Sequence, residues 1–189
     1  PEAIQRAHIN AELYQQMYDR SIQSPDEFWL EQAETLEWMK KPTMTRRYTW
    51  DTQARQIQHT WFEDGQLNVS VNCLDRHLKT ATKDKVAILW QGEPEEDVRK
   101  ITYAELHTEV CRCANVLKSM GVKKGDRVAI YLPMIPELPA VMLACARLGA
   151  IHSVVFGGFS ADALSGRIND STCKVLITSN VSLRAGKNI

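Results

Sequence analysis

The chain lacks both a charge imbalance and a long apolar run. Lys plus Arg and Asp plus Glu number 23 each among 189 residues, so the formal net charge is zero. No field of one sign draws the chain to nucleic acid or to anionic lipid, which argues against both as partners. The longest apolar stretch, about 135–150, contains Glu137 and Arg147 and is too short to span a bilayer. The first ten residues carry charges and no apolar core, so we expect a soluble chain without a targeting signal.

Paired cysteines and metal-binding motifs are also missing. The cysteines are odd in number and contain no C-x-x-C pair: Cys73, Cys111, Cys113, Cys145 and Cys173. Cys111 and Cys113 are two apart on an expected helix and point to different faces, which argues against a shared metal. The histidines show no pairing at a metal-ligand spacing. We therefore expect buried free thiols, a reducing cytoplasm and no metal site in this chain.

Residues 1–72 are expected to form a helical and irregular N-terminal extension. Asn10 can cap a first helix, and "SPDE" predicts a second, with Ser24 as cap and Glu27 reaching back to the cap nitrogen. The residues expected on the buried side of this second helix are Trp29, Ala33 and Leu36. From residue 41 to about 72 the pattern decays, and we expect an irregular wrap on another domain with a turn at Asp64–Gly65.

Residues 73–189 alternate between strand and helix patterns. Buried strand "VAILW" (86–90) precedes a helix with a capping box of Thr102 and Glu105 and a stop at Gly121. The apolar stripe of that helix is Leu106, Val110, Ala114 and Leu117. Further strands are expected at about 127–132, 152–156 and 174–178, with a helix buried on both sides at about 136–148 and another after Ser160. This order is typical of an α/β fold with a mainly parallel, helix-covered sheet. The chain ends soon after the last strand, so we expect a fragment: the truncated first portion of a larger domain.

Two segments follow expected strand ends, where ligands of open parallel sheets bind. In "VVFGGFS", Gly157-Gly158 would let a ligand approach the backbone, and the helix capped by Ser160 would aim free N–H groups at it. The site would suit a nucleotide or a phosphate. The alternative is that the two glycines only make a tight turn between strand and helix.

The second segment is "SNVSLRAGK", which ends in two basic residues. Arg184 and Lys187 are three apart, so a helical or tightly turned backbone would place them on one face. Such a pair suits a dianionic phosphate, with Arg as a fork and Lys as a point charge. The alternative is an ordinary solvated charged surface.

Standard catalytic and nucleotide motifs are missing. "GGFS" lacks the G-x-G-x-x-G spacing, and a Walker motif ending at Lys187 would need Gly at position 181 and Ser or Thr at 188, where the chain has Val181 and Asn188. Ser153 and Ser160 lack a G-x-S-x-G context. We therefore name no catalytic residue.

Three stretches of the chain carry a resemblance to a known family. "WFEDGQLNVSVNCLDRHL", "DRVAIYLPMIPELPAVMLACARLGAIHSVVFGGFSADALSGRINDS" and "VLITSN" with "RAGK" resemble the N-terminal part of acetyl-coenzyme A synthetases, in the AMP-forming adenylating superfamily. The likeness covers essentially the whole chain, and "NCLDRH" after "WFEDGQLN" is similar to the acetate enzymes, whereas propionyl and acetoacetyl enzymes vary there. The resemblance implies a two-step ligase. Acetate and ATP, with Mg²⁺, give acetyl-AMP and pyrophosphate, and the thiol of coenzyme A then takes the acetyl group.

The resemblance also implies where the chemistry lies. The family's Ser/Thr/Gly-rich phosphate loop, acetate pocket, magnesium site and catalytic lysine would lie after Ile189, in the missing remainder of the chain, so residues 1–189 alone are expected to be inactive. One family site maps onto this chain, the site for the nucleotide end of coenzyme A and its 3′-phosphate. Its residues here would be Phe156, Gly157 and Gly158 with Arg184, Ala185, Gly186 and Lys187. Two alternatives stay open: a non-catalytic module that binds coenzyme A or a protein, and a propionyl- or acetoacetyl-coenzyme A synthetase relative.

Overall fold

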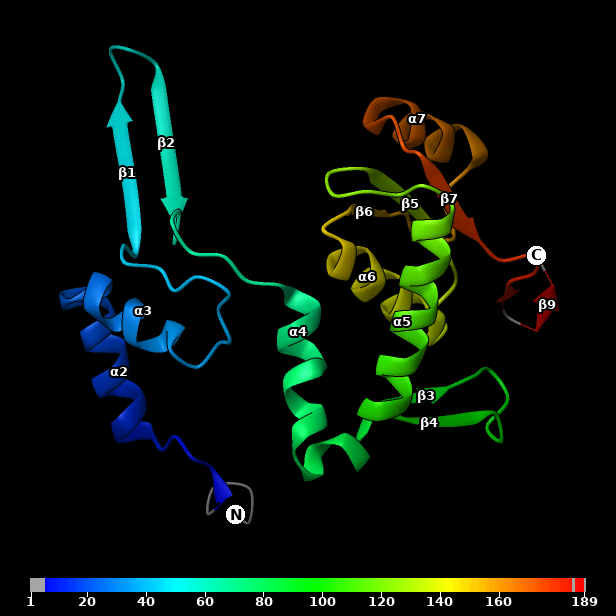
Figure 1. The fold of residues 1–189 in the computed structure, drawn as a ribbon, viewed down its shortest axis with the longest axis horizontal. Helices are drawn as coiled ribbons and strands as arrows, with labels where there is room; N and C mark the ends of the chain where they lie inside the picture. The colour runs from blue at the N-terminus through cyan, green and yellow to red at the C-terminus, as the bar shows by residue number, and fades with distance from the viewer. Residues whose placement is uncertain (1–5, 185, 189) are drawn as a thin grey trace. The chain divides into compact units, whose positions relative to one another are not determined.

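The computed structural model describes residues 6–184 and 186–188 and shows two compact units, Pro1–Leu67 and Asn68–Ile189, which are described separately. Figure 1 draws the first unit in blue to cyan and the second in green to red. No helix in the described part of the chain is long and apolar enough to cross a membrane.

Two helices open the first unit. Helix α2 (Ala11–Gln23) begins after Asn10, whose side-chain oxygen accepts the Leu13 N–H at 2.8 Å, which confirms the expected cap. Helix α3 (Pro25–Ala33) follows after one residue, Ser24. An ion pair between Arg20 and Glu31, with 2.6 Å between the charged atoms, connects the two helices.

The capping box expected at α3 is wrong. The Ser24 side chain makes no capping hydrogen bond to the helix. Ser24 also ends α2, because its N–H donates to the Arg20 carbonyl at 2.8 Å, and its backbone angles (φ −134°, ψ 59°) lie outside the extended region that an N-cap uses. The helix itself and the position of Pro25 in its first turn are confirmed.

The expected buried side of α3 is also partly wrong. Phe28 and Ala33 are buried, whereas Trp29 is 41% exposed. Leu36 lies beyond the helix and is 43% exposed. The helix ends early because the chain turns at Glu34, and the Trp38 indole donates to the Ala33 carbonyl at 2.8 Å.

The segment expected to be irregular contains a hairpin. Strand β1 (Arg46–Asp51) pairs antiparallel with β2 (Gln56–Trp61), and Arg46 lies opposite Trp61. Tyr48 and Trp50 on β1 and Ile57 and Trp61 on β2 alternate with polar residues, although both faces of the hairpin are mostly exposed. The turn expected at Asp64–Gly65 is present, since the Gly65 N–H donates to the Phe62 carbonyl at 2.8 Å.

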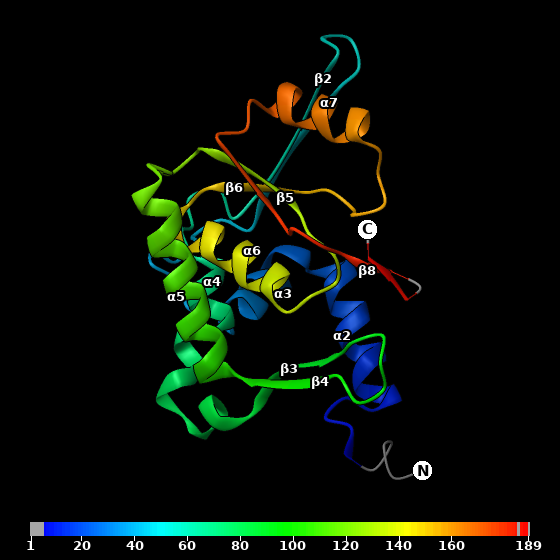
Figure 2. The same ribbon diagram turned by 90° about the vertical axis from the view of Figure 1, so that its right-hand side faces the viewer.

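The second unit is built on a three-stranded parallel sheet. Strand β5 (Arg127–Tyr131) lies between β6 (Ile151–Val154) and β7 (Val175–Thr178), and both pairings are parallel. Helix α6 (Glu137–Leu148) packs on β5 and β6, helix α5 (Tyr103–Ser119) packs on α6, and helix α7 (Ala161–Ser171) connects β6 to β7. Figures 1 and 2 both place α7 on the opposite side of the sheet from α5 and α6. The unit therefore has the α/β architecture that the sequence predicts.

Helix α5 forms as its sequence predicts. The Thr102 side chain and the Glu105 carboxylate bond each other's backbone N–H groups, so the capping box is complete. Gly121 has a φ of +82°, and the Val122 N–H returns to the Leu117 carbonyl at 3.0 Å, which closes the helix in a Schellman motif. The predicted stripe is buried against α6, in one core cluster with Val128 and Ile130 of β5: Leu106, Val110, Ala114 and Leu117.

The strand expected at 86–90 is present but is not buried. Strand β3 (Val86–Gln91) pairs antiparallel with β4 (Val98–Thr102) and forms a hairpin separate from the parallel sheet. Val86 is 48% and Leu89 67% exposed because this hairpin is covered by α5 on only part of its surface. The apolar run alone did not distinguish this strand from one buried in the sheet.

Short helical turns connect the start of the unit to its core: α4 (Val69–Cys73), η1 (Asp75–Lys79) and η2 (Ala81–Asp84). Arg147, on α6, donates two hydrogen bonds to the Asp75 carboxylate at 2.8 and 2.7 Å. The same guanidinium lies 3.0 Å from Nε2 of His107, on α5. Arg147 therefore ties α6, α5 and η1 together at one point.

Candidate functional site

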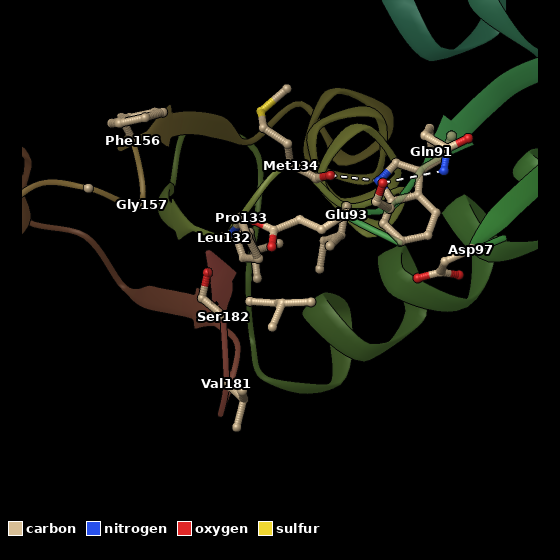
Figure 3. Close-up of a pocket in the computed structure, with 15 residues that line it drawn as sticks. Gln91, Glu93, Asp97, Leu132, Pro133, Met134, Phe156, Gly157, Val181 and Ser182 are labelled. Carbon is tan, nitrogen blue, oxygen red and sulfur yellow. Dashed lines mark hydrogen bonds between the residues drawn. The ribbon is translucent and has the colours of Figure 1, made fainter. Parts of the chain in front are cut away.

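The second unit contains a pocket of about 550 Å³ where the parallel strands end. Three of its walls follow the carboxyl ends of β5, β6 and β7, and the fourth comes from the β3–β4 hairpin (Figure 3). The lining residues are Leu132–Ile135, Phe156–Gly158, Val181–Leu183, and Trp90–Glu93 with Asp97. This is the edge of the sheet at which ligands of open parallel sheets bind.

The turn between β6 and α7 forms one wall of the pocket. Tyr131, the last residue of β5, donates its hydroxyl to the carbonyl groups of Gly157 and Phe159 at 3.1 and 3.0 Å. The Phe156 ring is 60% exposed and lies edge-on to the Phe159 ring. Ser160 caps α7 as the sequence predicts, since its oxygen accepts the Ala163 N–H at 3.3 Å. These contacts hold the turn in place.

Gly157 is not required to be glycine by the backbone. Its φ lies outside the left-handed region, and a Cβ built on it would be 3.5 Å from the Leu132 carbonyl oxygen, an ordinary van der Waals contact. Gly121, Gly125, Gly149 and Gly186 do have left-handed φ values, so glycine has a backbone reason at those positions. The turn alone does not account for glycine at position 157.

A small basic hairpin follows the wall formed by Val181–Leu183. Strand β8 (Leu183–Arg184) pairs antiparallel with β9 (Lys187–Asn188), and Arg184 lies directly opposite Lys187 in register. Gly186 turns the chain with a φ of +70°. Ala185 lies outside the described residues. The backbone thus has the tight turn that would bring the two basic residues together, and Leu183, which lines the pocket, leads directly into it.

The β3–β4 hairpin contributes residues that the sequence did not indicate. The Trp90 indole donates to the Met134 carbonyl at 2.7 Å, and this contact connects two walls of the pocket (Figure 3). Glu93 and Asp97 add carboxylates to the lining, and the Glu93 carboxylate accepts the Gly186 N–H at 2.8 Å. Applying the strand-end rule to "YLPMI" would have found Leu132–Ile135. No local signal shows that the 92–97 loop folds toward the pocket.

The pocket is mostly apolar, with carboxylates from Glu93 and Asp97 and no basic side chain among the described residues that line it. Aliphatic and aromatic side chains form most of its walls, glycine backbone is exposed at one of them, and a turn carrying Arg184 and Lys187 stands at its edge. Among the residues that the structure describes, no group of three or more His, Cys, Asp or Glu could hold a metal ion. The polar side chains of its lining include the Ser182 hydroxyl and the Glu93 and Asp97 carboxylates.

Comparison with known proteins assigns the chain to a class. Residues 74–188 match the family model described as AMP-binding enzyme. The chain belongs to this family of AMP-binding enzymes. Residues 14–73 match a second model, described as acetyl-coenzyme A synthetase N-terminus.

Individual relatives narrow the class to one kind of enzyme. The chain is 50% identical over 188 residues to an acetyl-coenzyme A synthetase of Shewanella sediminis and 53% identical over 188 residues to one of Bradyrhizobium diazoefficiens. It is 54% identical over 185 residues to one of Beijerinckia indica. These alignments cover 98% or more of this chain and 28% of each relative. The chain therefore spans little more than a quarter of the length of these relatives.

Proposed function

We propose that this chain is the N-terminal part of an acetate–coenzyme A ligase that forms AMP. In the complete protein, acetate attacks the α-phosphate of ATP to give acetyl-AMP and pyrophosphate, and the thiol of coenzyme A then displaces AMP to give acetyl-coenzyme A. The proposal is supported by identity of about 50% to acetyl-coenzyme A synthetases along essentially the whole chain. The match to a family model for the N-terminus of these enzymes supports it further.

Within that enzyme, the pocket binds the nucleotide end of coenzyme A. The observation that carries this proposal is the position of the Phe156–Gly158 turn and the segment leading to Arg184 in the walls of one pocket. The ligand lies on the exposed backbone of Gly157 and Gly158 and against Phe156. Arg184 and Lys187, together with Ala185 and Gly186, meet the 3′-phosphate, where a guanidinium fork and an ammonium suit a dianion.

The catalytic steps use residues beyond this chain. We propose that residues 1–189 alone catalyse neither step and that Mg²⁺ enters with ATP at a site outside them. Residues 1–72 form an N-terminal extension, and residues 73–189 form the first portion of the adenylating domain. Five free thiols accord with a reducing cytoplasm as the place of action.

The test is Arg184→Ala in the full-length protein. The KM for coenzyme A is expected to rise about tenfold or more, because a charge-assisted contact to the phosphate is lost. Acetate-dependent ATP–pyrophosphate exchange, which does not use coenzyme A, is expected to keep the wild-type rate. Arg112→Ala is the matched control, since Arg112 lies on α5 in an exposed ion pair with Glu109 and should change neither step.

Three results would contradict parts of this proposal. An equal loss in both steps on Arg184→Ala would mean that Arg184 is structural. Strong preference for propionate or acetoacetate over acetate would overturn the acetate assignment. Binding of coenzyme A by a full-length protein that releases no pyrophosphate with any of these acids would favour the non-catalytic binding module.

A further inference from the structure

We propose that Glu93 is a built-in competitor for the 3′-phosphate of coenzyme A, holding the basic turn until the ligand displaces it. The inference rests on the proposed function and concerns a residue of the pocket lining that is not among the proposed coenzyme contacts. According to this inference, the β3–β4 loop sets how much more tightly the pocket binds coenzyme A than coenzyme A without the 3′-phosphate.

The contact that carries the inference joins residues far apart in sequence. One oxygen of the Glu93 carboxylate accepts the backbone N–H of Gly186 at 2.8 Å. Gly186 lies between Arg184 and Lys187, which are opposite each other in register. A backbone N–H flanked by two basic residues is a site for an oxyanion. In the structure, an oxygen of the Glu93 carboxylate occupies that position.

Glu93 also belongs to the pocket itself. It lines the same pocket as Gly157 and Gly158, and Figure 3 shows it between the side formed by Gln91 and Asp97 and the side formed by Leu132 and Pro133. A phosphate that binds the Gly186 N–H takes the position of the Glu93 carboxylate oxygen. Displacement of Glu93 therefore accompanies binding of the phosphate end.

The loop that carries Glu93 is held in a defined conformation. The Gly92 N–H donates to the Asp97 carbonyl at 2.7 Å, and the Gln91 side-chain amide donates to the carbonyl groups of Pro94 and Glu95 at 2.8 and 3.0 Å. A Cβ on Gly92 would lie 2.5 Å from the Asp97 carboxylate, so any larger residue there would require the Asp97 side chain to shift. The carboxylate of Glu93 is thus presented by a fixed loop.

The negative charge of the loop also opposes binding of the phosphate. Residues 93–97 include four acidic residues: Glu93, Glu95, Glu96 and Asp97. They attract the basic turn and repel an incoming phosphate dianion. Removing the charge of Glu93 weakens the competing acceptor and removes part of the repulsion, so ligands with the 3′-phosphate gain affinity. Coenzyme A without that phosphate does not reach the turn and gains little.

The test compares coenzyme A with 3′-dephospho-coenzyme A on the full-length protein by isothermal titration calorimetry. In the wild type, coenzyme A is expected to bind more tightly than the dephospho form. Glu93→Gln is expected to increase that preference about threefold to tenfold at low salt, and the increase should shrink at high salt because the site is exposed. Glu96→Gln is the matched control, since it removes the same charge from the same loop at a residue outside the pocket lining.

A second measurement tests the contact without ligand. Glu93→Ala is expected to speed amide hydrogen exchange in the peptide that contains Gly186, relative to the wild type and to Glu96→Ala. An unchanged preference for coenzyme A in Glu93→Gln, with that preference lost in Arg184→Ala, would overturn the competitor and leave the proposed site standing. Equal binding of the two ligands by the wild type would overturn both.

Discussion

Replacement of Gly157 by alanine tests whether this glycine is needed for ligand binding or for the fold. The structure places the added Cβ 3.5 Å from the Leu132 carbonyl oxygen and shows no left-handed φ at this residue. Folding stability should therefore hold, and it should rise by about 0.4–1 kcal/mol where only the entropy of the unfolded chain changes.

The effect on coenzyme A should be large by comparison. In the proposed site the ligand lies on the Gly157 backbone, so the added methyl group occupies space that the ligand uses. Steric overlap of one carbon in a packed contact costs about 1–3 kcal/mol, which corresponds to a rise in the KM for coenzyme A of roughly 5-fold to 150-fold. Acetate-dependent ATP–pyrophosphate exchange, measured on the same full-length protein, should not change.

Gly121→Ala provides the opposite control. Gly121 has a φ of +82° and closes α5, so alanine there should cost about 1–2 kcal/mol of stability and leave the KM for coenzyme A unchanged. Thermal unfolding gives the stability of both variants, and steady-state kinetics gives the KM. A Gly157→Ala protein that loses more than about 1 kcal/mol of stability and keeps its KM would refute the reasoning, and the glycine pair would then be a turn.

Two further predictions concern stability and reactivity. Thr102→Ala should lower the free energy of unfolding by about 1 kcal/mol in urea titrations, because it removes the cap of α5. Hydrogen bonds from the Thr102 backbone and side chain lower the pKa of Glu105. The stabilisation from these bonds is therefore present above the ordinary carboxyl pKa and is lost as the pH falls through the lowered value. The difference in the free energy of unfolding between Thr102→Ala and the wild type should narrow in that pH range, and a constant difference would contradict this. Burial raises the pKa of the Cys145 thiol to about 11, so about one molecule in a thousand carries a thiolate there at pH 8. Mass spectrometry after brief iodoacetamide treatment should find Cys73, which is exposed, modified and Cys145 unmodified, and equal labelling would contradict the burial.

Local rules predicted those elements whose signals lie within a few residues. Helix α5 is the clearest case, since Thr102 and Glu105 start it, Gly121 ends it, and both devices are present in the structure. The order of β5, α6, β6, α7 and β7 followed from apolar runs with short joints. The parallel pairing of the strands also followed, because helices separate them.

Elements whose pairing partners are exposed or distant were not predictable in this way. In the β1–β2 hairpin the alternating residues Tyr48, Trp50, Ile57 and Trp61 are exposed, and each strand has only six residues, so the alternation is a short signal without a buried face. The strand at 86–90 looks like a sheet strand, but it pairs with residues 98–102 on the surface of the unit. At the start of α3, Ser24 also ends the preceding helix, and this second role displaced the capping geometry that the "SPDE" pattern predicts.

The residues of the candidate site were likewise predictable only in part. Phe156–Gly158 and the Val181–Leu183 wall directly follow strands, so the strand-end rule located them. Trp90, Glu93 and Asp97 reach the pocket from a hairpin outside the sheet. Their contribution depends on tertiary contacts such as the one between Trp90 and Met134, and no spacing within the sequence encodes these.

The positions of the lining residues along the chain determine when the pocket can form during protein synthesis. Its lining extends from Trp90 to Leu183, and the central strand β5 pairs with β7, which lies more than forty residues later in the chain. Contacts of such long range form late in folding. The ribosome must therefore release residue 183 before the pocket exists, and until then the edge of β5 that β7 covers stays open to wrong partners. The binding site thus matures only after the α5–α6 core beneath it has been synthesised.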